Sequence, residues 1–354
     1  MFAVLFFFPD FFFCKNTHFP KIIGRFFKII NIQISILRIF AAFNKLTYMV
    51  DMSEMLVVGV TSRALFNLEK ENEIFEREGV KRYREYQERN QDVPLEIGTA
   101  FYLVKSLLQL NKQAQRPVVE VVVMSRNSPE TGIRILKSIE KYDLDITRLA
   151  FTGGELMAPY IEAFGVDLFL SKDEKSVQSV IDSHSNCAAA VIYEPPTAFN
   201  PDDNTVKIAF DADAVLFSDE AEIYSRVEGL DEFHRYEDEH QDDPLPEGPF
   251  AKLLIKLSKI QASLPVTVEL SPLRLAIVSS RSAPAHMRVI KTLKKWGVYV
   301  NEVYFLGGMP KDKVLKAFGA HIFFDDQDLH LASSSKVVPS GKVPYSSDSP
   351  LKNM

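Results

Sequence analysis

Four short apolar runs in the second half of the chain each lead into side chains that suit phosphate and metal chemistry. These side chains are Asp211 and Asp213 after 206–210, Ser279 after 275–278, Lys311 after 302–306, and Asp325 and Asp326 after 321–324. Carboxylates that end an apolar strand are costly to desolvate unless they face a cation or stay hydrated. Mg²⁺ takes hard oxygen ligands and needs only one or two carboxylates besides water and a substrate oxygen. The set therefore predicts a site for Mg²⁺ and a phosphate group.

The elements that position these residues are strands alternating with helices. In the second half we expect helices after the strands over 220–226, 229–240, 250–261, 285–296 and 311–318. This alternation predicts right-handed crossovers and a parallel α/β sheet of Rossmann-like type, with helices on both faces. Chemistry in such sheets sits at the carboxyl ends of the strands, so the polar residues should gather at one edge.

The polar set belongs to the second copy of an internal repeat. Residues 121–172 align with residues 275–326 at an offset of 154, which pairs Gly153-Gly154 with Gly307-Gly308. Further matches upstream lie at offsets of 150 and 151. Ordered matches of this kind predict two related halves in one chain.

The same motifs resemble those of the haloacid dehalogenase phosphohydrolase superfamily and, within it, the cytosolic 5′-nucleotidase type I family. The segments that carry the resemblance are FDADAVLFSDE (210–220), IVSSRSA (277–283), GGMPK (307–311), IFFDDQ (322–327), VTSRALF (60–66) and FTGG (151–154). Ala212 stands where animal members usually have Gly. The resemblance implies two pseudo-repeated haloacid dehalogenase-like halves, with a small cap inserted between the first two motifs of the second half.

The resemblance also implies roles for individual residues. Asp211 would attack phosphorus and form an aspartyl-phosphate, and Asp213 would act first as general acid and then as general base. Ser279 would donate to a phosphoryl oxygen, while Lys311 would balance the negative charge. The implied Mg²⁺ ligands are the Asp211 carboxylate, the Asp213 carbonyl and one carboxylate of Asp325-Asp326.

The first half lacks this machinery. By the sequence offsets, Asp211 corresponds to Val60, Asp213 to Ser62, Lys311 to Met157, and Asp325-Asp326 to Ser171-Lys172. The polar residues left at its strand ends include Arg63, Arg126 and Thr152, which are hydrogen-bond donors without a compensating acid. Two interpretations stay open: a half kept for packing, which we favour, and a half that binds a nucleotide as substrate or regulator.

The region of the expected cap holds an acidic run and two histidines. We interpret Glu237 to Asp243 as a solvated helix face, and His234 and His240 as surface or packing residues rather than metal ligands.

The ends of the chain differ in composition from its body. Residues 1–48 hold six basic residues, one acid and twelve of the 27 Phe, so their net charge is +5 and the rest carries −11 of the total of −6. Three interpretations of this segment stay open: a mis-assigned start, which we favour, an interfacial membrane anchor, or a transit peptide.

An acidic body argues against binding to nucleic acid polymers. Cys14 and Cys187 form no disulfide framework, which favours a cytoplasmic location.

These observations divide the chain into five segments. We expect a Phe-rich basic extension over 1–50, a degenerate half over 51–175, a connecting helix and strand over 176–204, a catalytic half over 205–331, and a disordered tail over 332–354. The expected activity is Mg²⁺-dependent hydrolysis of nucleoside 5′-monophosphates, with AMP as the family's substrate. The alternatives are a phosphatase acting on another small phosphate ester and a nucleotide-sensing protein with vestigial hydrolysis. A membrane association is not expected; a nucleotide activator and a homo-oligomer stay open.

Overall fold

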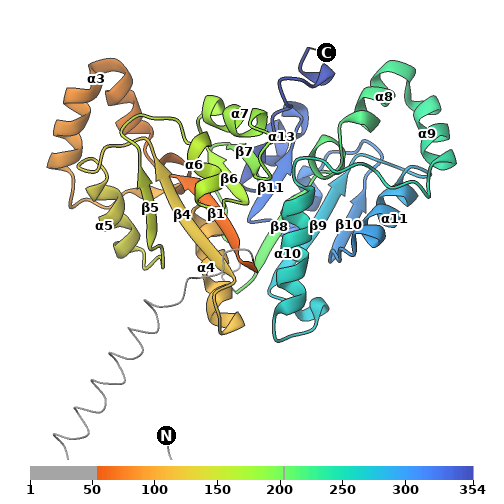
Figure 1. Ribbon diagram of the computed structural model, residues 1–354, viewed down its shortest axis with the longest axis horizontal. Coiled ribbons are helices and arrows are strands. Elements are labelled where there is room, and N and C mark those ends of the chain that lie inside the picture. Colours follow the sequence, from red (N-terminus) through yellow and green to blue (C-terminus); the bar gives the residue numbers. More distant parts are fainter. Residues whose placement is uncertain (1–53, 202–203, 354) are drawn as a thin grey trace, which may run out of the picture. The chain divides into compact units, whose positions relative to one another are not determined.

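A ten-stranded sheet runs through the computed structural model, which describes residues 54–201 and 204–353 (Figure 1). The expectations for the extension over 1–50 lie outside the described residues. The first half contributes β1 (Leu56–Thr61), β4 (Val119–Ser125), β5 (Arg148–Phe151), β6 (Leu168–Ser171) and β7 (Ala188–Ile192). The second half contributes β8 (Val206–Phe210), β9 (Leu273–Ser279), β10 (Glu302–Phe305), β11 (Ile322–Asp325) and β12 (Ser340–Lys342).

The strand order shows that the two halves are joined in one sheet. The order is β10-β9-β8-β11-β12-β7-β6-β1-β4-β5. All neighbours are parallel except β12 and β7, which pair antiparallel through Gly341 with Ile192 and Lys342 with Val191. We call this pairing the seam. The order on one side of the seam repeats in reverse on the other, so the halves are related by a pseudo-twofold axis. The predicted α/β class and repeat are confirmed.

The helices repeat in the same way. The first half has α2 (Ser62–Leu65), α3 (Glu69–Arg89), α4 (Phe101–Ala114), α5 (Ile133–Lys141), α6 (Ala158–Ala163) and α7 (Glu174–Asp182). The second half has α8 (Glu220–Glu228), α9 (Leu230–Glu239), α10 (Ala251–Ser263), α11 (His286–Trp296), α12 (Asp312–Phe318) and α13 (Asp328–Ser334). β2 (Phe66–Asn67) and β3 (Glu96–Ile97), which flank α3 in the chain, form a separate two-stranded antiparallel sheet.

The repeat extends further than the sequence predicted. Residues 176–204 contribute most of α7 and all of β7, which complete the first half rather than connect two domains. The expectation of a disordered tail over 332–354 is wrong. β12 pairs with β11 and β7, and Leu351 is buried. The low apolar content of this segment does not indicate a strand. β12 is nevertheless ordered, because backbone hydrogen bonds hold it on both of its sides.

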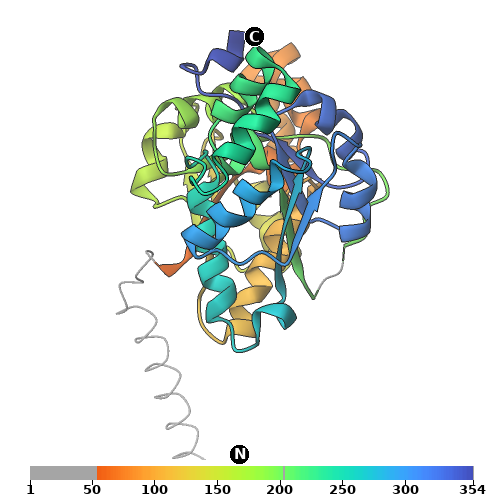
Figure 2. The same cartoon turned by 90° about the vertical axis from the view of Figure 1, so that its right-hand side faces the viewer.

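Helices cover both faces of the sheet, as the side view shows (Figure 2). On one face, α4 and α10 pack into a single apolar core that continues across both halves and includes Val58, Leu107, Leu254 and Phe324. On the other face, two separate cores lie under α6 and α7 and under α12 and α13. Alternate residues of β1 face opposite cores, which explains its uninterrupted apolar sequence.

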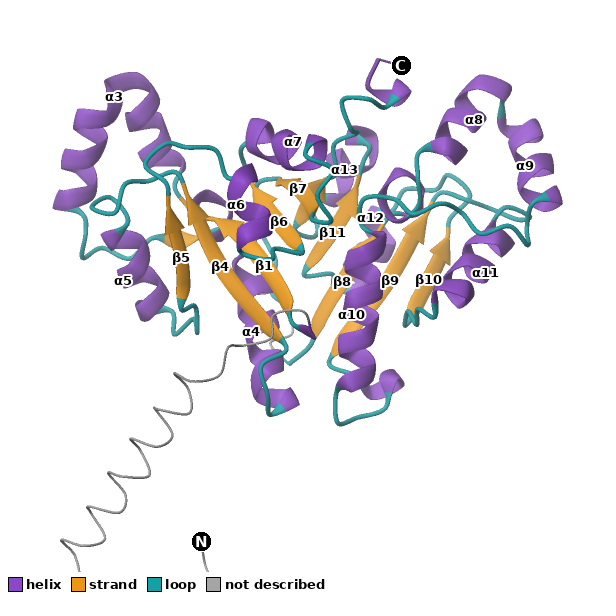
Figure 3. Cartoon of the chain, in the orientation of Figure 1, coloured by secondary structure: helices purple, strands orange, loops and turns teal. Residues whose placement is uncertain are grey.

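In each half, a bent helical segment lies beside the carboxyl ends of the strands. The strand arrowheads of β4, β5, β8, β9 and β10 point toward the side that carries α3, α8 and α9 (Figure 3). α3 is kinked at Gly79 (φ 79°, ψ 177°), and α8 and α9 meet at Gly229 (φ 88°, ψ 170°). Positive φ favours glycine, so both bends depend on it. α8 and α9 therefore occupy the place where the cap is expected, and α3 occupies the matching place in the first half.

Among residues 54–201 and 204–353, no helix combines the length and apolar character needed to cross a lipid bilayer.

Candidate active site

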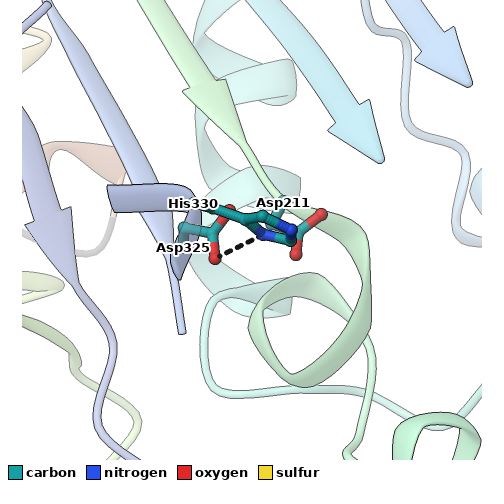
Figure 4. A group of neighbouring side chains, drawn as sticks. All are labelled: Asp211, Asp325 and His330. Atoms are coloured by element: carbon teal, nitrogen blue, oxygen red, sulfur yellow. Dashed lines mark hydrogen bonds and ion pairs between the residues drawn. The ribbon is translucent and has the colours of Figure 1, made fainter. Parts of the chain in front are cut away.

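The ends of β8 and β11 bring two carboxylates onto one lysine. Lys311 Nζ lies 2.8 Å from Asp211 Oδ1 and 2.8 Å from Asp325 Oδ2, and its side chain is fully buried. His330 Nδ1 lies 3.2 Å from Asp325 Oδ2 (Figure 4). The Gln327 N–H donates to Asp325 Oδ1 at 2.9 Å. Burial alone would raise the pKa of Asp325, but the Lys311 ammonium and His330 hold it below its usual value. Asp325 is thus a fully engaged anion.

Asp326 lies in the opposite situation. Its Oδ2 accepts a hydrogen bond from the Tyr345 hydroxyl, while its Oδ1 is buried with no partner. Glu222 of α8, whose negative charge reaches Asp326, also has one buried oxygen without a partner. Burying a carboxylate oxygen without a hydrogen-bond donor costs free energy. A cation bound next to these two oxygens would remove that cost.

The pKa shifts describe the same excess of negative charge. Burial raises the pKa of Asp211 to about 7; the neighbouring Asp325 adds to this rise and Lys311 opposes it. Burial, together with the charges of Asp211, Asp325 and Glu222, also holds the pKa of Asp326 well above its usual value. Both carboxyls are therefore poised to bind a positive charge in exchange for a proton.

The residues present fit a divalent metal ion. Asp211, Asp325 and His330 each offer a ligand atom, and these atoms lie within 4.8 Å of one another. His330 and Asp325 already engage each other, and Mg²⁺ prefers oxygen to nitrogen. The free oxygen of Asp326 is a better candidate than the His330 ring.

The second aspartate of the first motif is held by an arginine that the sequence analysis did not assign. Arg281 donates from Nε to Asp213 Oδ2 at 2.8 Å and from Nη2 to Asp213 Oδ1 at 2.7 Å. The Arg281 guanidinium also pairs with Glu237 of α9, which a second arginine, Arg288, contacts at 2.8 Å. Glu237 is fully buried, so its expected place on a solvated helix face is wrong. A buried carboxylate needs such paired cations.

Other predicted residues take supporting positions. Ser279 is buried at the end of β9, where its Oγ accepts the Arg281 N–H at 3.1 Å. His234 Nε2 lies 3.4 Å from Ser282 Oγ, and the His240 ring stacks on Tyr236 with centroids 4.1 Å apart. Neither histidine belongs to the carboxylate cluster, in agreement with the packing interpretation.

The strand register corrects the correspondence at the first motif. Val60 occupies the place of Phe210 in the pairing with the neighbouring strands, so the counterpart of Asp211 is Thr61 and not Val60. The short helix after Asp211 has five residues, against four in α2. Leu65-Phe66 matches Leu216-Phe217 at an offset of 151, whereas Thr61 and Asp211 lie 150 residues apart. The extra residue lies between these two positions, so applying the offset of 151 to the strand end shifts the correspondence by one residue.

The strand ends of the first half line a cavity of about 450 Å³. Arg63 and Arg126, both predicted to bind substrate, lie on its wall. Thr152 is not among the lining residues, and its hydroxyl donates to the Glu155 carbonyl at 2.9 Å. The structure therefore places Arg63 and Arg126 at the cavity, whereas Thr152 makes a hydrogen bond within its own turn.

Four residues of the second half were missed by sequence reasoning. These are Arg281, Glu237, His330 and Tyr345. Arg281 lies within the second motif and His330 follows the fourth closely, so both could have been suspected from their positions. Glu237 and Tyr345 lie far from any motif in sequence, so no local signal indicates them.

Comparison with known proteins identifies a family and a curated relative. The family model for 5′-nucleotidase matches residues 48–350. Human "Cytosolic 5'-nucleotidase 1B" is 34% identical over 291 residues, which cover 80% of this chain and 47% of that protein. The chain thus spans about half the length of this curated relative. No solved structure shows a significant match.

Proposed function

Because the chain belongs to the 5′-nucleotidase family, we propose that it hydrolyses nucleoside 5′-monophosphates to nucleoside and phosphate, with AMP as the expected substrate. The observation that carries this proposal is the buried Asp211–Lys311–Asp325 cluster, beside the unpartnered carboxylate oxygen of Asp326. The name of the human relative supports both this activity and a cytoplasmic location.

In the proposed reaction, Asp211 supplies the nucleophile. Its carboxylate oxygen bonds to phosphorus while the bond to the nucleoside 5′-oxygen breaks, and Asp213 gives that oxygen a proton. Asp213 then removes a proton from water, whose oxygen displaces Asp211 and releases phosphate. Lys311 keeps Asp211 oriented and balances the incoming charge.

The proposed cofactor is Mg²⁺, held by the carboxylates of Asp211 and Asp326 and the carbonyl of Asp213. When bound, it would screen the carboxylates from the phosphate and polarise a phosphoryl oxygen. In the described residues, Asp325 instead orients Lys311 and His330.

A phosphate-release screen tests the proposal. Nucleoside monophosphates and sugar phosphates are compared with Mg²⁺ and with EDTA, using the chain, its Asp211→Asn variant and the exposed control Asp348→Asn. We expect AMP hydrolysis that needs Mg²⁺ and falls at least about a thousandfold in Asp211→Asn, with Asp348→Asn unaffected. A preference for sugar phosphates would contradict the nucleotidase assignment, and release by folded Asp211→Asn would contradict the covalent route.

A further inference from the structure

The cavity of the first half has the same place in its half as the candidate active site has in the other. Its floor is formed at the ends of β1 and β4, and its wall by α3, the counterpart of the α8–α9 cap. We propose that this cavity binds a nucleotide without hydrolysing it, with the phosphate on the floor and the base against α3. This inference goes beyond the proposed function and does not depend on hydrolysis in the second half.

The floor presents polar atoms that have no partner within the protein. Arg63 Nε, Asn127 Nδ2 and Thr61 Oγ1 are all buried without a hydrogen bond, and all three residues line the cavity. Buried donors are nearly always satisfied in folded proteins, so three together indicate an absent acceptor. All three can donate a hydrogen, and a phosphate offers several acceptor oxygens to such a set.

The orientation of Asn127 is fixed by its neighbours. Gln87 Nε2 donates to the Tyr83 hydroxyl at 3.0 Å, and that hydroxyl donates to Asn127 Oδ1 at 3.1 Å. With its oxygen occupied, the Asn127 amide keeps its N–H₂ group free. The chain of hydrogen bonds therefore ends on a donor, which suits an anion and not a metal ion.

The charges at the floor are consistent with an anion bound without metal. Ser171 and Lys172 replace the two carboxylates of the fourth motif, and Thr61 replaces the nucleophile. Lys172, like Arg63, pairs with Glu69, which offsets part of their charge. Without a carboxylate nucleophile or its metal ligands, a bound phosphate ester would stay intact.

The α3 wall supplies an apolar surface of the kind that a base requires. Phe75 and Val80 of α3, together with Leu68 just before it, line the cavity, and the residues Phe75 and Val80 are 46% and 49% exposed. Stacking and apolar contacts on such a surface add affinity for a flat ring. A bare phosphate would use only the floor, so the combination points to a nucleotide.

Equilibrium binding to the full chain in EDTA tests the site. EDTA removes divalent metal ions, so hydrolysis stops. The unscreened carboxylates of the second half then repel phosphate. The probes are AMP, inorganic phosphate and adenosine, measured by isothermal titration calorimetry. The variants are Asn127→Asp, which turns a donor into an acceptor of the same shape, and Thr61→Val, which removes an unpartnered hydroxyl. Asn90→Asp, outside the cavity, adds the same charge to the same half.

We expect AMP to bind more tightly than either phosphate or adenosine. Asn127→Asp should weaken AMP binding at least about tenfold and Thr61→Val about threefold to tenfold, whereas Asn90→Asp should leave it unchanged. If Asn127→Asp does not fold, Thr61→Val carries the test, because its hydroxyl makes no bond that folding needs. AMP binding that is absent at millimolar concentration, or unchanged in both variants, would overturn the proposal. Equal affinity for phosphate and AMP would overturn the nucleotide assignment. Mg²⁺-dependent phosphate release, assayed separately, reports on the second half alone.

Discussion

At the scale of single residues, the folded protein holds Asp211 under opposing electrostatic influences. Its pKa of about 7 exceeds the usual value near 4, so between these pH values the metal-free folded state binds more protons than the unfolded state. By linkage, the free energy of unfolding falls as pH rises through this window. The largest loss from Asp211 alone is about 4 kcal/mol above pH 7.

We predict that the melting temperature in EDTA falls between pH 5 and pH 8, and that Asp211→Asn removes part of the fall. Asparagine has no proton to lose, so this variant should be more stable than the native chain at pH 8. Mg²⁺ should raise the melting temperature of the native chain more at pH 8 than at pH 5. Calorimetry on both proteins, with Asp348→Asn as control, measures this. Parallel pH profiles for the native chain and Asp211→Asn would contradict it.

The sequence could predict the acidic strand ends but not all of their partners. Asp211 and Asp325 follow apolar runs, and this local pattern can be recognised in the sequence without knowledge of the fold. Tyr345 reaches Asp326 from a segment whose Ser and Pro content resembles disorder, so its role depends on the tertiary fold alone. The shift from Val60 to Thr61 arises from one extra residue in a turn, which only the strand register reveals.

At the scale of elements, helix α9 is attached to the site through Glu237. This side chain lies between Arg281, which orients Asp213, and Arg288 of α11. The equivalent position in the first half is Gln87, which lies 3.5 Å from the Nη1 of Arg134. In the first half Arg134 pairs instead with the buried Glu71, near the start of α3, at 2.6 Å.

We predict that Glu237→Gln lowers the free energy of unfolding by about 3 kcal/mol, because it leaves two buried guanidinium groups short of a counter-charge. The turnover of AMP should also fall, since Arg281 then positions Asp213 less well. Urea unfolding and initial rates measure the two effects. Glu239→Gln, in the last turn of the same helix, serves as control and should stay within about 0.5 kcal/mol. Native stability in Glu237→Gln would show that α9 is held by other contacts.

The seam between β12 and β7 leads to a second prediction at this scale. Removing residues 338–354 takes away β12 and leaves the edges of β7 and β11 unpaired. Exposed strand edges promote association, so the shortened protein should aggregate. Removing only 352–354 should preserve solubility. Sedimentation of the two proteins compares them, and a soluble monomer lacking 338–354 would contradict the structural role of the seam.

At the scale of the whole molecule, two halves of one architecture carry different polar residues at their strand ends. The predicted outcome is one phosphoryl-enzyme site per chain. Beryllium fluoride with Mg²⁺ mimics an aspartyl-phosphate, so fluorine NMR should detect one bound site, which Asp211→Asn abolishes. Thr61→Asp should not add a second, because Met157 supplies no ammonium at the place of Lys311, and Ser171 and Lys172 supply no carboxylate for a metal ion. Two Mg²⁺-dependent sites per native chain would contradict this asymmetry.

The seam also has a consequence during synthesis on the ribosome. β7, with the apolar sequence AAAVI, is made about 150 residues before its partner β12. Throughout that interval the first half can fold around β1, β4, β5 and β6, but β7 keeps one edge without a partner. Unpaired apolar edges in incomplete chains are sites of misassembly. The nascent protein is therefore exposed to aggregation until β12 emerges, and slow translation of the second half should lengthen its need for chaperones.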